Sequence, residues 1–454
     1  MVFFLRHCLA GLMASVFFLS SATLMAGSPL KTNIDGRPFH WGHEIVFNAE
    51  GGAIKPGVID HEASVTLVKE ALEEWAAVPG VSLNIVEGPQ LPDGGDTTAG
   101  NYAQFYKANP WDCYDNNPST PCYSPILFDE DGSMIEDLFG SCAQFSILGF
   151  SGFTDVAGDS QNPSWLELKR GQAIFSGACI APAQSKPGCP PCNVVLQPEE
   201  IKPLILHEMG HFLGLGHAQV NPDTYLACHS QGTCPEEVRE QIPTMFPLLM
   251  KGADMLTLHR DDQLSMQRLY GDPASSTCEI SGTVLAADDS TPLRGVEVVA
   301  RNTATGESFT DAVATISGEM SPKLTAKGKE VSNCLENCGD FSLPGLKPGE
   351  TYQLCVQRIL DTFTGTKFVG PADPPFQGVD QDCPEALEFT CTCSGPECDR
   401  WEGVKVVTSN KGLDFNYAVN QESVPMASGC SLAHRYTPTY TWYRLAFVSR
   451  IFFS

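Results

Sequence analysis

The stretch that decides the fold of this chain is Leu206-His207-Glu208-Met209-Gly210-His211-Phe212-Leu213-Gly214-Leu215-Gly216-His217. Its histidines and glutamate follow the spacing H-E-x-x-H-x-x-G-x-x-H. Residues four positions apart lie on one face of an α-helix, so His207 and His211 can present two imidazoles to one metal ion. Glu208 projects on the neighbouring side, where its carboxylate can reach a water at the metal without being a ligand. The spacing therefore predicts a metal-binding helix.

This helix must end before His217, because six more helical residues would carry that imidazole away from the other two. Gly214 tolerates the left-handed backbone that ends a helix and turns the chain back. Three neutral imidazoles leave one position open for water or substrate, as in catalytic rather than structural zinc sites. We therefore predict zinc ligands at His207, His211 and His217, with Glu208 as the catalytic residue. The alternative is a buried helix whose histidines are only hydrogen-bonded.

The long form of this motif resembles the signature of the metzincin zinc peptidases, in particular a matrixin-like, bacterial secreted type. The resemblance covers residues 36–272 and implies a mixed twisted sheet with an active-site helix. Met245, in Ile242-Pro243-Thr244-Met245-Phe246-Pro247, matches the methionine turn that lies beneath the zinc in this family. The resemblance also implies that substrate adds as a strand to the sheet edge, with Gly171–Phe175 as the candidate edge near Ala173–Ser176. The cysteine-switch segment of the matrix metalloproteinase propeptides is absent from this sequence. No histidine occurs between His61 and His207, so no counterpart of the family's second, structural zinc is expected.

Apolar periodicity predicts the elements around the motif. The expected helices cover residues 63–78, a stretch that starts near Glu200 with Pro203 in its first turn, and residues 256–271 with Thr257 as cap and Gly271 as terminator. The expected strands cover residues 44–48, 81–86, 126–128, 146–150 and 171–175.

An acidic segment follows the strand at 126–128 and contains Asp129, Asp131 and Asp137. Carboxylates at alternating positions around a glycine turn can converge on a hard cation, so Ca²⁺ is one interpretation. The other is a turn with hydrogen-bonded and solvated carboxylates. The residue twelve along is Gly140 rather than glutamate, which excludes an EF-hand. The sequence leaves both interpretations open.

The composition changes from Cys278 onward, where short alternating strands are separated by glycine- and proline-rich turns. Strands are expected over 280–284, 293–300, 339–343 and 352–356, with a turn at Leu346-Lys347-Pro348-Gly349. Their order resembles the carboxypeptidase regulatory-like, transthyretin-type domain. The predicted fold class is therefore α+β: a metzincin-type domain followed by an all-β sandwich at 276–360 and a cysteine-rich extracellular region at 361–428.

The composition also indicates a compartment. The net charge of −26 and the absence of a basic cluster argue against a nucleic-acid partner. Residues 1–26 read as a secretory signal peptide. Eighteen cysteines fit an oxidising compartment, so the protein is expected to be secreted or extracellular. Attachment to the cell surface is the alternative left open.

Without Cys8, which lies in the expected signal peptide, eight cysteines precede residue 272, an even number that fits four disulfides: Cys113, Cys122, Cys142, Cys179, Cys189, Cys192, Cys228 and Cys234. A zinc-ribbon use of Cys189-Pro190-Pro191-Cys192 is the competing interpretation, although no second C-x-x-C is present for it. The segment 429–454 is a C-terminal tail that weakly resembles a sorting signal, with Cys430 expected to be unpaired. Its apolar part is shorter than the ~20 residues of a membrane span, and membrane association is expected only through this tail.

The function that these features predict is a secreted zinc-dependent endopeptidase acting on protein or peptide substrates. One rival is a surface adhesion or binding protein with a vestigial peptidase domain, against which the retained Glu208 argues. The other is a zinc hydrolase of non-peptide amides.

Overall fold

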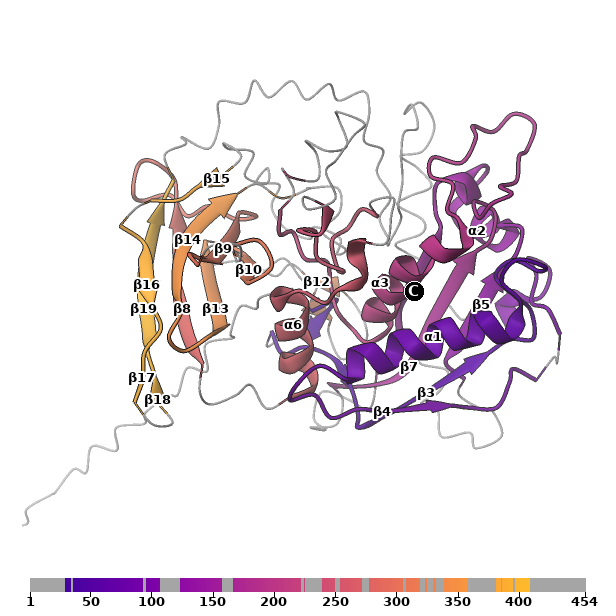
Figure 1. Ribbon diagram of the computed structural model, residues 1–454, viewed down its shortest axis with the longest axis horizontal. Helices are drawn as coiled ribbons and strands as arrows, with labels where there is room; N and C mark the ends of the chain where they lie inside the picture. Colours follow the sequence, from indigo (N-terminus) through magenta and orange to yellow (C-terminus); the bar gives the residue numbers. More distant parts are fainter. Residues whose placement is uncertain are drawn as a thin grey trace, which may run out of the picture.

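The structure is a computed structural model of the 454-residue chain. It describes residues 29–408 except 34–35, 93–94, 107–122, 157–165, 222–223, 225–238, 250–253, 272–276, 305–307, 319–322, 325–329, 332–338, 358, 360–380, 385 and 395–396. The described residues form two parts with separate hydrophobic cores, a mixed α/β part and a β-sandwich, with helix α6 between them (Figure 1). The α+β class is therefore confirmed at this level. The predicted segments 1–26 and 429–454 lie outside the described residues, as does Cys430.

The first part is built on one mixed sheet, in the order β2-β7-β5-β3-β4 with β6 added beside β7. Its strands are β2 (His40–Trp41), β3 (Glu44–Ala49), β4 (Asn84–Glu87), β5 (Pro125–Asp129), β6 (Gly149–Val156) and β7 (Glu167–Ser176). The strand β6 runs antiparallel to β7, whereas the other pairings are parallel. The strands expected from the sequence are thus present, with shifted ends.

Two helices cover one face of this sheet, α1 (His61–Ala76) and α3 (Lys202–Phe212), which pack against each other (Figure 1). Helix α1 begins at its N-cap Asp60, whose carboxylate accepts the backbone N–H of Ala63 at 3.0 Å. Its buried face, Val65, Val68, Leu72 and Trp75, is the periodic set that predicts the helix. The other face of the sheet is covered by a second apolar cluster that includes η1 (Tyr102–Gln104) and α2 (Ser133–Phe139).

The closing helix α6 (Arg260–Tyr270) starts later than the sequence predicts. Its N-cap is His259 rather than Thr257, because the carboxylate of Asp262 returns to the backbone N–H of His259 at 2.9 Å and closes a capping box. Gly271 ends the helix as expected, with its N–H on Gln267 O at 2.8 Å. The helix therefore carries Asp261 and Asp262 in its first turn, both buried.

The second part is a sandwich of two sheets around one apolar core. One sheet has the order β10-β9-β14-β15 with β16 beside β14, and the other has the order β13-β8-β19. The strands are β8 (Cys278–Leu285), β9 (Glu297–Asn302), β10 (Ala312–Ile316), β13 (Asp340–Leu346), β14 (Thr351–Gln357), β15 (Gln381–Asp382), β16 (Glu388–Thr390) and β19 (Arg400–Val407).

The boundary expected at residue 360 needs correction. Strands β15 and β16 pair with β14, and β19 pairs with β8, so the region assigned separately to 361–428 supplies strands to the sandwich up to Val407. The hairpin of β17 (Cys393–Ser394) and β18 (Glu397–Cys398) is attached to the same part. Such additions depend on long-range pairing, which short cysteine-rich runs do not reveal.

Five disulfides lie among the described residues: Cys142–Cys189, Cys179–Cys192, Cys278–Cys391, Cys355–Cys383 and Cys393–Cys398. The disulfide expectation is thus confirmed for four cysteines of the first part; Cys113, Cys122, Cys228 and Cys234 lie outside the described residues. Because Cys189 and Cys192 are each bonded to another cysteine, they form no zinc ribbon. In the described part of the chain, no helix is long and apolar enough to cross a membrane.

Candidate metal centre

Helix α3 and the turn after it bring the three motif histidines together. All three are buried, with side chains at most 5% exposed. The Nε2 atom of His211 lies 3.0 Å from that of His207 and 3.2 Å from that of His217. Gly214 makes this approach possible, because its φ of +96° reverses the chain two residues after the helix ends. The structure therefore places the three predicted ligands at one point.

The outer ring nitrogens fix how these imidazoles are oriented. The Nδ1 of His207 donates to Thr244 O at 2.8 Å, and the Nδ1 of His211 donates to Leu215 O at 2.7 Å. With the proton on Nδ1, each neutral ring directs an Nε2 lone pair at the other. Burial lowers the pKa of His207 to about 4 and that of His211 well below its usual value, so both rings are neutral at pH 7.

Lone pairs that face each other repel unless a cation lies between them. Four ligands at about 2.0–2.1 Å around a tetrahedral zinc are roughly 3.3 Å apart, close to the Nε2 separations here. Among the described residues, His207, His211 and His217 form one of two groups that could hold a metal ion. The other, Cys278, Cys391 and Cys393, consists of cysteines already bonded in disulfides. The donor set thus fits zinc at the histidines.

Glu208 is buried beside these imidazoles, with 1% of its surface exposed. Its Oε2 has no hydrogen-bond partner within the described residues, and burial raises the pKa of its carboxyl well above the usual value. An unpartnered buried carboxylate is costly in a folded protein unless function requires it. The strand β6 approaches it closely: a Cβ on Gly149 would lie 3.1 Å from Glu208 Cγ. The Glu208 side chain therefore lies against the start of β6.

The turn at Thr244-Met245 packs against α3 next to the three histidines. Met245 is 2% exposed and lies against α3 at Gly210, where an added Cβ would clash with the Met245 sulfur. The Asp262 carboxylate accepts the backbone N–H groups of Thr244 and Met245, each at 3.1 Å. The sequence motif predicts Met245 at this place but does not reveal Asp262, whose hydrogen bonds reach back across 17 and 18 residues.

Aromatic side chains satisfy the carbonyl groups at the end of α3, which would otherwise lack partners. The indole N–H of Trp41 donates to Phe212 O at 2.8 Å, and the hydroxyl of Tyr270 donates to Leu213 O. The next carbonyl, that of Gly214, accepts the backbone N–H of Leu30 at 2.8 Å. The end of the helix, and hence the path to His217, is thus held by three distant segments.

The edge of the sheet differs from the expectation. Residues Ala173–Ser176 of β7 pair with β5 on one side, and the same stretch of β7 pairs with β6 on the other. β7 is therefore an inner strand, and the described edge strand beside Glu208 is β6. Residues 170–176 of β7 are all buried, as is typical of an inner strand.

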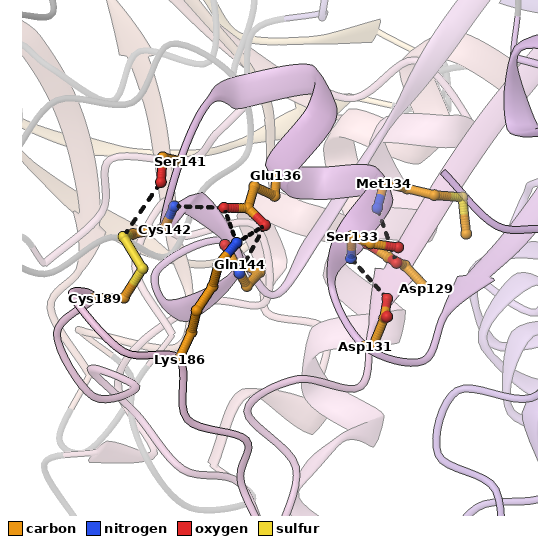
Figure 2. A network of polar contacts seen from close by, with 10 residues as sticks. All are labelled: Asp129, Asp131, Ser133, Met134, Glu136, Ser141, Cys142, Gln144, Lys186 and Cys189. Atoms are coloured by element: carbon orange, nitrogen blue, oxygen red, sulfur yellow. Dashed lines mark hydrogen bonds and ion pairs between the residues drawn. A yellow bond between two sulfur atoms is a disulfide. The ribbon is translucent and has the colours of Figure 1, made fainter. Parts of the chain in front are cut away.

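The carboxylates of Asp129 and Asp131 accept hydrogen bonds from backbone groups at the start of α2 (Figure 2). The Asp129 carboxylate accepts the N–H groups of Met134 and Ile135, and Asp131 accepts that of Ser133 at 2.9 Å. Asp137 accepts the hydroxyl of Tyr102 at 2.7 Å. The three do not appear among the groups of described residues that could hold a metal. This geometry favours the hydrogen-bonded turn, and calcium binding stays an untested prediction.

Comparisons with known proteins add little. No family model matches the chain, and no curated protein matches it. Among solved structures, the dioxygenase domain of a dioxygenase–carbohydrate-binding protein fusion from the cellulolytic bacterium Streptomyces sp. SirexAA-E is matched at 18% identity, over 30% of this chain and 80% of that one. Its TM-score is 0.15, too low to support an inference about fold or function.

Proposed function

We propose that this protein is a secreted zinc-dependent endopeptidase. The observation that carries the proposal is the cluster of three buried imidazoles, whose Nε2 atoms lie 3.0 and 3.2 Å apart while two Nδ1 atoms donate to backbone carbonyls. Glu208, the residue after His207, is buried, and its Oε2 has no hydrogen-bond partner among the described residues. Three neutral nitrogen donors with an open fourth position suit catalytic zinc.

The chain's own residues divide the work as follows. His207, His211 and His217 would hold the ion, and Thr244 and Asp262 would keep the first of these rings in place. A bound zinc supplies a Lewis acid that polarises the scissile carbonyl and lowers the pKa of a water toward ~7. Glu208 accepts the proton of the attacking water and passes it to the leaving amine, as a general base within hydrogen-bond reach does.

The edge strand β6 supplies a place for an extended peptide. Its inner side is paired with β7, and Gly149 brings it against Glu208. An extended substrate that added a strand at this edge would present its scissile bond to the carboxylate. The proposed substrate class is therefore an unfolded or exposed segment of a protein, and β6 replaces β7 as the strand that receives it.

The substitution Glu208→Gln tests this function in the chain without residues 1–26. It is expected to retain one bound zinc and to lose at least ~10²-fold in peptide hydrolysis, because a general base contributes ~10²–10⁴-fold. A casein or gelatin zymogram with and without a chelator separates the rivals. An adhesion protein shows no clearing, and a hydrolase of other amides binds zinc but leaves protein intact. A Glu208→Gln variant with near-normal proteolysis would exclude the assigned role.

The disulfides are consistent with an extracellular location, which we include in the proposal. Attachment to a surface or membrane would involve the segment 429–454, outside the described residues.

A further inference from the structure

The β-sandwich packs directly against the segment that follows the third histidine. Val220, three residues after His217, is 1% exposed and shares a buried cluster with Val299 of β9 and with Ala312 and Ala314 of β10. A residue from the first part thus completes an apolar face of the second.

The next residue, Asn221, connects three segments. Its backbone φ of +66° is a left-handed conformation that asparagine adopts more readily than most residues. Its Nδ2 donates to Gln241 O at 2.5 Å, and its Oδ1 accepts from the Arg301 guanidinium of β9 at 2.9 Å. Because the oxygen faces Arg301 and the nitrogen faces Gln241, the arginine sets the orientation of the amide.

Arg301 is held firmly by its own part of the chain. It is 5% exposed, and it also donates to Ser308 O at 3.1 Å and to Gln357 Oε1 at 3.0 Å. Its guanidinium lies 5.3 Å from the centre of the Phe309 ring. Because these partners hold the planar guanidinium in one orientation, it can hold the Asn221 amide in a fixed position.

The two segments joined at Asn221 both lead to the metal centre. One contains His217, and the N–H of the adjacent Ala218 donates to Met245 O at 2.9 Å. The other begins at Gln241 and reaches Thr244, whose carbonyl accepts from the His207 ring at 2.8 Å. The Asn221 amide therefore links the segment that contains His217 to the segment whose Thr244 carbonyl orients His207.

We infer that Arg301 is a positioning residue for the metal centre: through Asn221 it holds the segment after His217 in register with the Thr244-Met245 turn. The sandwich is then part of the zinc site's support. This inference rests on the proposed zinc centre.

The test measures zinc affinity of the chain without residues 1–26, by competition with a chromophoric chelator. Arg301→Met removes the charged fork, and Asn221→Gly removes the amide while tolerating the left-handed backbone. Each is expected to weaken zinc binding by about tenfold, the lower end for a group that orients ligands. The double variant is expected to be no weaker than the worse single variant, because the two residues act through one contact. The visible absorption of the Co²⁺-substituted protein is expected to change in both.

Val406→Ala provides the control, because Val406 is fully buried in β19, which pairs only with β8 among the described strands. It is expected to lower the melting temperature of the zinc-free protein and leave zinc affinity and the Co²⁺ spectrum unchanged. The inference is overturned if Arg301→Met and Asn221→Gly bind zinc as tightly as wild type, or if Val406→Ala weakens zinc equally. A wild-type chain that binds no zinc would overturn the proposed function, and the inference with it.

Discussion

Asp261, at the start of α6, is expected to make the protein less stable as the pH rises. The carboxyl is 1% exposed; its Oδ1 accepts the backbone N–H of Ala314 in β10 at 2.8 Å, and its Oδ2 has no hydrogen-bond partner in the described structure. Burial raises its pKa from 3.8 to about 8; the neighbouring Asp262 adds to this rise, while Arg268 opposes it. The folded protein therefore keeps a proton that the unfolded chain releases above pH 3.8.

The sign and size of the effect follow from this difference in bound protons. In the pH range where the folded state binds one more proton than the unfolded state, each rise of one pH unit lowers the free energy of unfolding by about 1.4 kcal/mol. The stabilising protonated form is fully present below the unfolded pKa of Asp261, and its contribution declines up to the folded pKa of about 8. Between pH 5 and pH 7 the free energy of unfolding of wild type should thus fall by about 2.7 kcal/mol relative to that of Asp261→Asn, because the asparagine side chain cannot ionise.

Chemical unfolding of zinc-free wild type and Asp261→Asn at several values between pH 5 and pH 7 measures this difference. Residue 261 is uncharged in both folded proteins between pH 5 and pH 7, so its neighbours Asp262 and Arg268 feel the same charge there, and the difference between the two curves isolates residue 261. Asp289→Asn, which changes the same charge at an exposed position, serves as control and should run parallel to wild type. Parallel curves for wild type and Asp261→Asn would refute the reasoning.

Two further predictions concern the turn after α3 and the acidic segment. Gly214→Ala should cost about 1–2 kcal/mol for its left-handed backbone and weaken zinc binding by displacing His217, since the added Cβ would lie 3.3 Å from Phe39 O. Gly80→Ala, also left-handed but with open space around it, should lose similar stability and keep its zinc affinity; equal zinc loss in both would contradict this. Asp131→Ala should respond to millimolar calcium with the same change in melting temperature as wild type, because the Asp131 carboxylate is engaged with Ser133 N–H in a turn. A rise confined to wild type would instead favour the calcium site.

The sequence alone predicted the local features. The four-residue spacing of His207 and His211 depends only on helix geometry, and Gly214 ends α3 through its own backbone freedom, with φ of +96°. The strands and helices with clear periodicity were placed for the same reason, since side-chain patterning is read within one element. His217 could be grouped with the other two ligands because only a short turn separates them.

Tertiary structure decided what depends on pairing between distant segments. The choice of β6 over β7 as the edge strand follows from the order of strands in the sheet, which no local pattern encodes. The same holds for Asp262 beneath the Thr244-Met245 turn and for Arg301, which reaches Asn221 across 80 residues. These groups are single polar residues whose partners lie on other elements, so only the folded chain shows which backbone or side-chain atoms they hold. The sequence thus identified the three histidines of the proposed zinc site, and the fold determined what positions them.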